Sequence, residues 1–171
     1  MRALHGEKTL LTSPMLFWAV LLALAVLTPD IASAGPKGRE LAANAVEKDA
    51  VRQVIGRFVS AWNRDDTDAL VQLFLPDGSF VSATGASART RGDIKRLLTE
   101  ERDRIFKGTT LAKTIHSITF DEGQTAQVTG VYELEGLDML MVPIAPDGVF
   151  RFVLTKKGNQ WLIQRASIAH T

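Results

Sequence analysis

Apolar residues recur at steps of three and four over residues 46–62, which is the spacing of one face of an α-helix. A polar break at 63–66 follows, and either Asp66 or Thr67 is a residue type that can cap the start of a helix. We therefore predict a short second helix over 67–74. A third apolar stripe over 94–105 predicts another helix, with the charged run at 100–104 on its outer surface.

After the third helix the apolar period changes from about 3.6 to two, which is typical of half-buried strands. A short strand is also expected at 79–82, between a turn at 76–78 and a polar loop at 85–91. The longer strands are predicted over 111–120, 125–134, 139–144, 149–155 and 161–169. Helices followed by a run of antiparallel strands predict an α+β fold, with the helices packed on one face of the sheet.

The first 34 residues have the pattern of a secretory signal peptide. Basic Arg2 and Lys8 precede an uninterrupted apolar run at 16–27, and Ala32-Ser33-Ala34 fits the small-x-small cleavage rule. The run is shorter than the ~20 residues that cross a bilayer, although an uncleaved anchor remains the alternative. We expect an exported protein, periplasmic or secreted, without membrane contact after cleavage. Residues 35–45 would form a flexible lead-in and 46–171 a single domain.

Composition narrows the chemistry further. The 171 residues include 20 basic and 19 acidic side chains, and this balance argues against a nucleic-acid partner. The chain has no cysteine, so disulfides and thiolate chemistry are excluded. Only His116 and His170 follow the leader, without metal-ligand spacing, so neither a metal site nor a cofactor is expected.

The segment 61–85, AWNRDDTDALVQLFLPDGSFVSATG, resembles a characteristic block of the SnoaL-like, SgcJ/EcaC-type subgroup of the nuclear transport factor 2 superfamily. Residues 90–97 and 156–171 resemble the later blocks of the same subgroup. The resemblance implies the ketosteroid-isomerase-like cone, in which three N-terminal helices pack on a curved, mainly antiparallel sheet. It also implies ligand binding inside the cone and a homodimer formed through the outer sheet face. Members include isomerases, polyketide cyclases, dehydratases, epoxide hydrolases and non-catalytic modules.

The residues of the ketosteroid isomerase reaction are missing. The resemblance places Ser82 where that reaction needs a carboxylate base, and Phe58 where it needs a tyrosine. A serine cannot move that proton and a phenylalanine cannot donate to an enolate. The isomerase mechanism is therefore not expected here.

His116 is the candidate acid or base. It alternates with Ile118 and Phe120, so a period of two predicts that it faces the core. An imidazole in that position can transfer protons near neutral pH. The alternative is a hydrogen-bonded histidine with a purely structural role.

The candidate ligand-binding residues share inward positions or lie near the expected mouth of the cone. Arg165 has the parity of the apolar positions of the last strand, and a buried arginine needs an acidic partner or an anionic ligand. Trp62 would form a wall or simply pack in the core. The remaining candidates are Tyr132 and Ser167, predicted to face inward, and the loop residues Arg89 and Arg91, which would clamp an anion or carry solvated surface charge.

Two functions remain open on this basis. One is binding of an unidentified small molecule in the cone, with or without cofactor-free acid–base chemistry of an isomerase, cyclase or lyase type. The other is a non-catalytic oligomerisation or interaction module that uses the outer sheet face. The methionine-rich stretch at 137–144 favours the second, because methionine suits adaptable contact surfaces.

Overall fold

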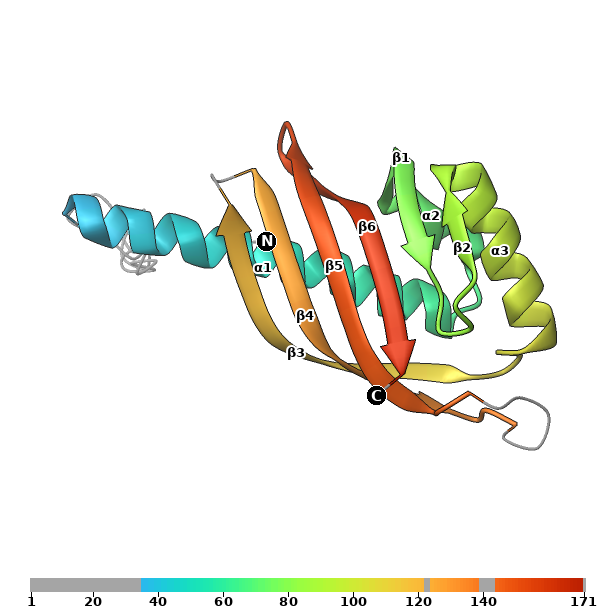
Figure 1. Cartoon of the computed structure of the whole chain (residues 1–171). Coiled ribbons are helices and arrows are strands. Elements are labelled where there is room, and N and C mark those ends of the chain that lie inside the picture. The colour runs from blue at the N-terminus through green and yellow to red at the C-terminus, as the bar shows by residue number, and fades with distance from the viewer. Residues whose placement is uncertain (1–34, 122–123, 139–143, 171) are drawn as a thin grey trace, which may run out of the picture.

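A computed structural model describes residues 35–121, 124–138 and 144–170 of the chain. The predicted signal peptide and most of the strand predicted at 139–144 lie outside these residues. Figure 1 shows helix α1 crossing one face of a curved sheet, with the remaining helices beside the sheet's other end. The predicted α+β cone is confirmed. The elements are α1 (Pro36–Asn63), α2 (Thr67–Gln72), β1 (Phe74–Val81), β2 (Ser87–Arg89), α3 (Thr90–Arg104), β3 (Thr110–Asp121), β4 (Thr125–Glu135), β5 (Asp147–Lys157) and β6 (Gln160–His170).

The sheet has six strands in the order β2-β1-β6-β5-β4-β3. All neighbouring strands are antiparallel except β1 and β6, which run parallel. Parallel pairing is possible there because α3 and three long strands intervene between the two along the chain. The pairing places the first strand of the chain beside the last one.

The three predicted helices are confirmed, and Asp66 caps α2 by accepting a hydrogen bond from the Ala69 backbone N–H at 2.8 Å. The expected lead-in at 35–45 is instead the first part of α1, which begins at Pro36 and projects beyond the sheet (Figure 1). Proline is favoured at the first helical position, which explains this early start. Val46, predicted on the buried stripe, is 66% exposed because it belongs to the projecting part.

The strand boundaries differ from the prediction near β1. The expected turn at 76–78 lies inside β1, where the pairing with β6 shifts between Phe74 and Ser79. The short strand β2 falls in the segment predicted as a polar loop, and it pairs with the end of β1. Three-residue strands carry too few residues to show a period of two.

The core lies between α1, α3 and the concave face of the sheet. Phe58 of α1 meets Phe152 of β5 edge-on, with ring centroids 5.1 Å apart. At the far end of the sheet, Glu47 of α1 accepts hydrogen bonds from Lys156 Nζ at 2.5 Å and Trp161 Nε1 at 2.7 Å. These contacts fix α1 across the strands. None of the helices in the described part of the chain is long and apolar enough for a membrane span.

Two β-bulges change which side chains face the core. The register of β3 against β4 shifts between Ile115 and Ser117, and that of β6 against β5 shifts so that Gln164 is the extra residue. Each bulge inserts one residue and reverses the in–out alternation beyond it. Side-chain directions predicted from a strict period of two therefore fail at these two places.

Candidate functional site

A small cavity lies inside the cone, between α1, α3 and the sheet. Its volume is ≈ 20 Å³, and its lining includes four polar residues among apolar ones such as Phe106 and Leu111. A cavity of this volume admits about one water molecule. The polar lining residues are Trp62, Ser82, Glu101 and Tyr132.

Three of these residues each carry a buried polar atom that has no hydrogen-bond partner among the described residues. The atoms are Trp62 Nε1, Glu101 Oε2 and the Tyr132 hydroxyl, and the three residues are 6%, 6% and 4% exposed. Buried polar groups in folded proteins are nearly always hydrogen-bonded, because an unpaired one costs about 1–3 kcal/mol. The three residues line one cavity, but the unpaired atoms themselves are closed off from it, so a polar partner can reach them only if the walls move.

Glu101 is the only carboxyl group that lines this cavity among the described residues. Its Oε1 accepts hydrogen bonds from Ser82 Oγ at 2.6 Å and Thr84 Oγ1 at 2.5 Å. These hydroxyls are in turn held by the backbone, since the Thr84 N–H donates to Ser82 Oγ and the Ala86 N–H donates to Thr84 Oγ1. The turn between β1 and β2 thus holds one carboxyl oxygen in place and leaves the other unpaired.

No cation pairs with Glu101 anywhere in residues 35–121, 124–138 and 144–170. Isolated buried carboxylates are rare because removing their charge from water is costly. The prediction that residues 100–104 lie on an outer surface was wrong for this residue. Glu101 follows Leu98 by three positions and Ile94 by seven, so helical spacing already placed it on the apolar stripe.

Arg102, the neighbour of Glu101 in sequence, is buried but directed elsewhere. Its Nε donates to Asp65 Oδ1 at 2.7 Å, and one terminal nitrogen donates to the Thr109 carbonyl at 3.2 Å. The guanidinium also lies 4.8 Å from the centre of the Trp62 ring, within cation–π range. Arg102 therefore ties the end of α1 to the start of β3 and holds one wall of the cavity.

Tyr132 projects from β4 and its ring covers Gly148, its register partner on β5. A Cβ atom on Gly148 would lie 3.0 Å from the tyrosine hydroxyl and only 2.2 Å from the Ala169 carbonyl oxygen, so glycine is required there. Burial raises the pKa of the Tyr132 hydroxyl, and the nearby Asp147 carboxylate adds to the shift. The hydroxyl is thus a neutral hydrogen-bonding group at physiological pH.

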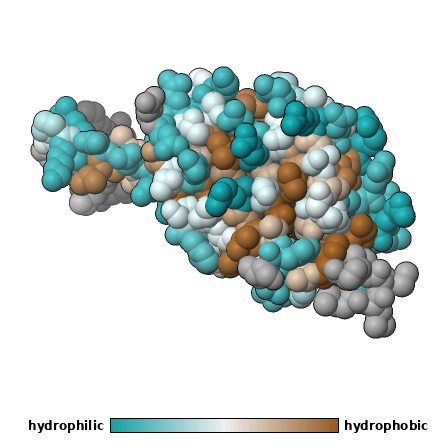
Figure 2. Space-filling model, viewed as in Figure 1, coloured by the Kyte–Doolittle hydropathy of each residue, from teal (hydrophilic) through white to brown (hydrophobic). Residues whose placement is uncertain are grey.

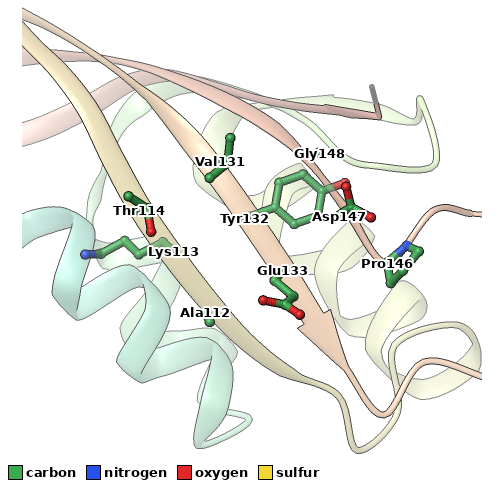
Figure 3. A pocket seen from close by; sticks show the side chains of 9 residues that line it. All are labelled: Ala112, Lys113, Thr114, Val131, Tyr132, Glu133, Pro146, Asp147 and Gly148. Carbon is green, nitrogen blue, oxygen red and sulfur yellow. The ribbon is translucent and has the colours of Figure 1, made fainter.

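A wider, open hollow of ≈ 460 Å³ lies over the same ends of β3, β4 and β5. Figure 3 shows Tyr132, Glu133 and Asp147 around it. Glu133 and Asp147 are register partners on the exposed face, so this hollow carries two adjacent carboxylates. It differs from the cavity in being open to solvent.

Only some of the residues predicted for the site line the cavity. Trp62 and Tyr132 face the cavity as expected. His116, predicted to face the core, is exposed because the bulge in β3 inserts it. Arg165, predicted to share the face of Trp161, is likewise exposed because the bulge at Gln164 reverses its direction.

Three further predicted site residues are also outside the cavity. Ser167 lies on the outer face beside Arg151, its register partner, because the same bulge in β6 reverses its direction as well. Arg89 is exposed at the end of β2. Arg91 forms hydrogen bonds within the fold: its Nε donates to the Phe74 carbonyl at 2.8 Å, and a terminal nitrogen donates to the Gln72 side chain at 3.1 Å.

Comparison with known proteins agrees with this architecture. The sequence profile of the SnoaL-like domain matches residues 44–167. Solved structures that share the fold include the following three. A domain of unknown function with a cystatin-like fold from Nostoc punctiforme PCC 73102 is 21% identical, with a TM-score of 0.63 over 74% of this chain and 78% of that one. A Novosphingobium aromaticivorans DSM 12444 protein named "Putative Scytalone Dehydratase" is 23% identical, with a TM-score of 0.62 over 75% of this chain and 86% of that one.

The third is an NTF-2 like protein of unknown function from Shewanella oneidensis MR-1, 22% identical, with a TM-score of 0.57 over 72% of this chain and 98% of that one. At these identities the likeness establishes the fold and not the activity. No curated protein matches the chain.

Proposed function

Because the chain belongs to the SnoaL-like domain family, we propose that it binds a small molecule in the cavity inside the cone. The observation that carries this proposal is that Trp62, Glu101 and Tyr132, which line one cavity, each hold a buried polar atom without a partner among the described residues. A ligand that satisfied these atoms would recover the free energy lost by burying them. The fold encloses such a site by construction, since the helices cover the concave face of the sheet.

The donors and acceptors define the ligand's chemistry. The indole N–H of Trp62 only donates, so it requires an acceptor such as a carbonyl or hydroxyl oxygen. Glu101 Oε2 accepts from a ligand hydroxyl when the carboxyl is ionised. The other walls are apolar, so the ligand is a small oxygenated and otherwise apolar molecule. The ≈ 20 Å³ of space means that any ligand larger than water must move the walls apart.

Glu101 is also the residue that we propose as the general acid or base of a cofactor-free reaction, in place of His116. The family resemblance puts the usual base at Ser82, and Glu101 Oε1 lies 2.6 Å from the Ser82 hydroxyl. Helix α3 thus brings a carboxylate to the place where β1 has none. A carboxylate held there can take a proton from a bound hydroxyl, or from a carbon beside a carbonyl, and return it. One fold neighbour is named a dehydratase, and dehydration uses such a group.

The test uses residues 35–171 and a matched pair of helix variants. Saturation-transfer NMR with phenol and cyclohexanone should show saturable binding that Glu101→Gln and Tyr132→Phe weaken about tenfold. Glu100→Gln, an exposed neighbour on α3, should leave binding unchanged. If neither probe binds, and a high-resolution crystal structure shows one water bonded to all three atoms, the cavity is structural and the proposal fails.

Export of the mature domain is part of the same proposal, supported by the leader pattern at residues 1–34. A fusion of this leader to a reporter active only outside the cytoplasm should be processed after Ala34. A processed, soluble product would favour a periplasmic or secreted protein. An unprocessed, membrane-bound product would favour the retained anchor.

Self-association through the outer sheet face is a second candidate. Val131 and Val149 are register partners on that face and are 36% and 41% exposed. Figure 2 looks onto the strands and shows hydrophobic surface among the polar groups there. Sedimentation should then show a homodimer that Val149→Asp dissociates. A monomer at millimolar concentration would remove this candidate.

A further inference from the structure

The outer face of the sheet carries an open hollow, separate from the cavity. An open hollow of ≈ 510 Å³ lies over β3–β6, within the ~300–1,000 Å³ of ordinary ligand pockets. Its lining includes His116, Thr129, Arg151 and Ser167, with Val149 and Ala169 beside them. None of these residues lines the interior cavity.

The polar side chains form one row across the strands. Arg151 is the register partner of Thr129 on β4 and of Ser167 on β6. His116 lies at the bulge of β3, adjacent to Ser117, which pairs with Thr129. Paired residues on one face of a sheet have Cβ atoms about 4.5–5.5 Å apart, so these side chains are within reach of one ligand.

Arg165 extends the basic character of this row. It precedes Ser167 by two positions on β6, which makes it the diagonal neighbour of Arg151, with Cβ atoms roughly 7–8 Å apart. Within the described part of the chain neither guanidinium has a hydrogen-bond or ion-pair partner. The ladder partners of Arg165 are Val153 and Ser79, and those of Arg151 are also uncharged. Two unneutralised arginines side by side attract an anion.

The bulges are an independent observation that points to the same face. The bulge at Gln164 turns Arg165 outward, because the alternation of Trp161 and Ile163 would otherwise direct it to the core. The bulge in β3 adds His116 as an extra exposed residue before Ser117. Bulges are over-represented next to functional sites because they re-aim individual side chains. Both bulges thus leave a basic side chain on the outer face, near the row that contains Arg151.

We propose that this hollow binds the anionic group of a ligand, a carboxylate or a phosphate, at Arg151, with His116 and the hydroxyls of Thr129 and Ser167 as further donors. Arg165 lies outside the lining and adds positive charge beside it. The site uses the planar donor pattern of guanidinium groups, which fits two oxygens of such an anion. It neither requires nor excludes a ligand in the interior cavity.

The test is a titration of residues 35–171 with inorganic phosphate and, separately, with succinate, followed by ¹H–¹⁵N NMR at constant ionic strength. Saturable shifts are expected at amides of β4, β5 and β6 around Arg151. Arg151→Gln should weaken binding about tenfold or more, and Arg165→Gln should weaken it to a smaller degree. Arg57→Gln removes the same charge from an exposed position of α1 and should leave binding unchanged.

Stronger binding of phosphate than of succinate would identify a phosphate ligand, and the reverse a carboxylate. Equal weakening by Arg151→Gln and Arg57→Gln would mean attraction to net charge only and would overturn the proposal. So would shifts that depend on protein concentration and not on the anion, because the face would then be an interface between copies. Glu101→Gln should not alter anion binding, so failure of this site and failure of the cavity proposal are distinguishable.

Discussion

Replacing Tyr132 by phenylalanine tests the central premise of the cavity site, that its polar atoms lack partners. Tyr132 is 4% exposed, and its hydroxyl has no hydrogen-bond partner among the described residues. In most proteins, deletion of a buried tyrosine hydroxyl loses about 1 kcal/mol, because that hydroxyl is hydrogen-bonded. Here the variant removes an unsatisfied group and keeps the ring, so we expect the free energy of unfolding to rise by about 1 kcal/mol. For a domain of this size that corresponds to an increase in Tm of roughly 4 °C.

The pH dependence gives a second readout of the same variant. Burial raises the folded-state pKa of Tyr132 above its ordinary 10.0, with a smaller contribution from Asp147. Above pH 10 the unfolded chain loses this proton while the folded chain keeps it, so stability falls as pH rises towards the folded-state pKa. Tyr132→Phe should lack this part of the alkaline loss. Urea unfolding at pH 7 and pH 10.5, with matched m-values, measures both effects.

The opposite result at neutral pH would refute the reasoning. If Tyr132→Phe lost 1 kcal/mol or more with an unchanged m-value, the hydroxyl would have a partner, most simply a bound water. The cavity would then be an internally satisfied polar cluster. The proposal that it is prepared for a ligand would lose its main support.

Three further predictions use the same unfolding assay. Ser82→Ala should destabilise the fold by about 1–3 kcal/mol, because it removes a hydrogen bond to the buried Glu101 carboxyl, and an unchanged stability would contradict that bond. Gly148→Ala should lower the free energy of unfolding by about 3 kcal/mol, because its Cβ would lie 2.2 Å from a backbone oxygen of β6. Gly56→Ala in α1 places its Cβ where no atom lies within 4 Å, so it should raise the free energy of unfolding by up to ~1 kcal/mol. Similar effects of the two variants would be inconsistent with this packing. Glu47→Gln should lower stability modestly at neutral pH, because hydrogen bonds from Lys156 and Trp161 lower the pKa of Glu47 below 4.5. The difference in stability from wild type should disappear as pH falls through that lowered pKa. A difference that persists in acid would exclude the ion pair as its cause.

The sequence by itself determined the fold class, the three helices and the four long strands of the described residues. These follow from local periodicity, which the backbone geometry of helices and strands imposes directly. The family block at 61–85 added the cone and the absence of the isomerase residues. The burial of Trp62 and Tyr132 was also predicted from sequence, because the helical spacing of α1 and the alternation of β4 are regular up to these residues.

Tertiary structure alone decided the composition of the site. One extra residue in a strand reverses every later side chain, and nothing in the local composition marked the bulges at His116 and Gln164. Because of the bulge at Gln164, Arg165 and Ser167 lie on the outer face of the sheet and not in the core, where they were predicted. The position of Glu101 was also beyond prediction from sequence, because its helical spacing favours the core while its charge favours the surface. The pairing with Ser82 and Thr84, which makes its burial tolerable, exists only once β1 and α3 have packed together.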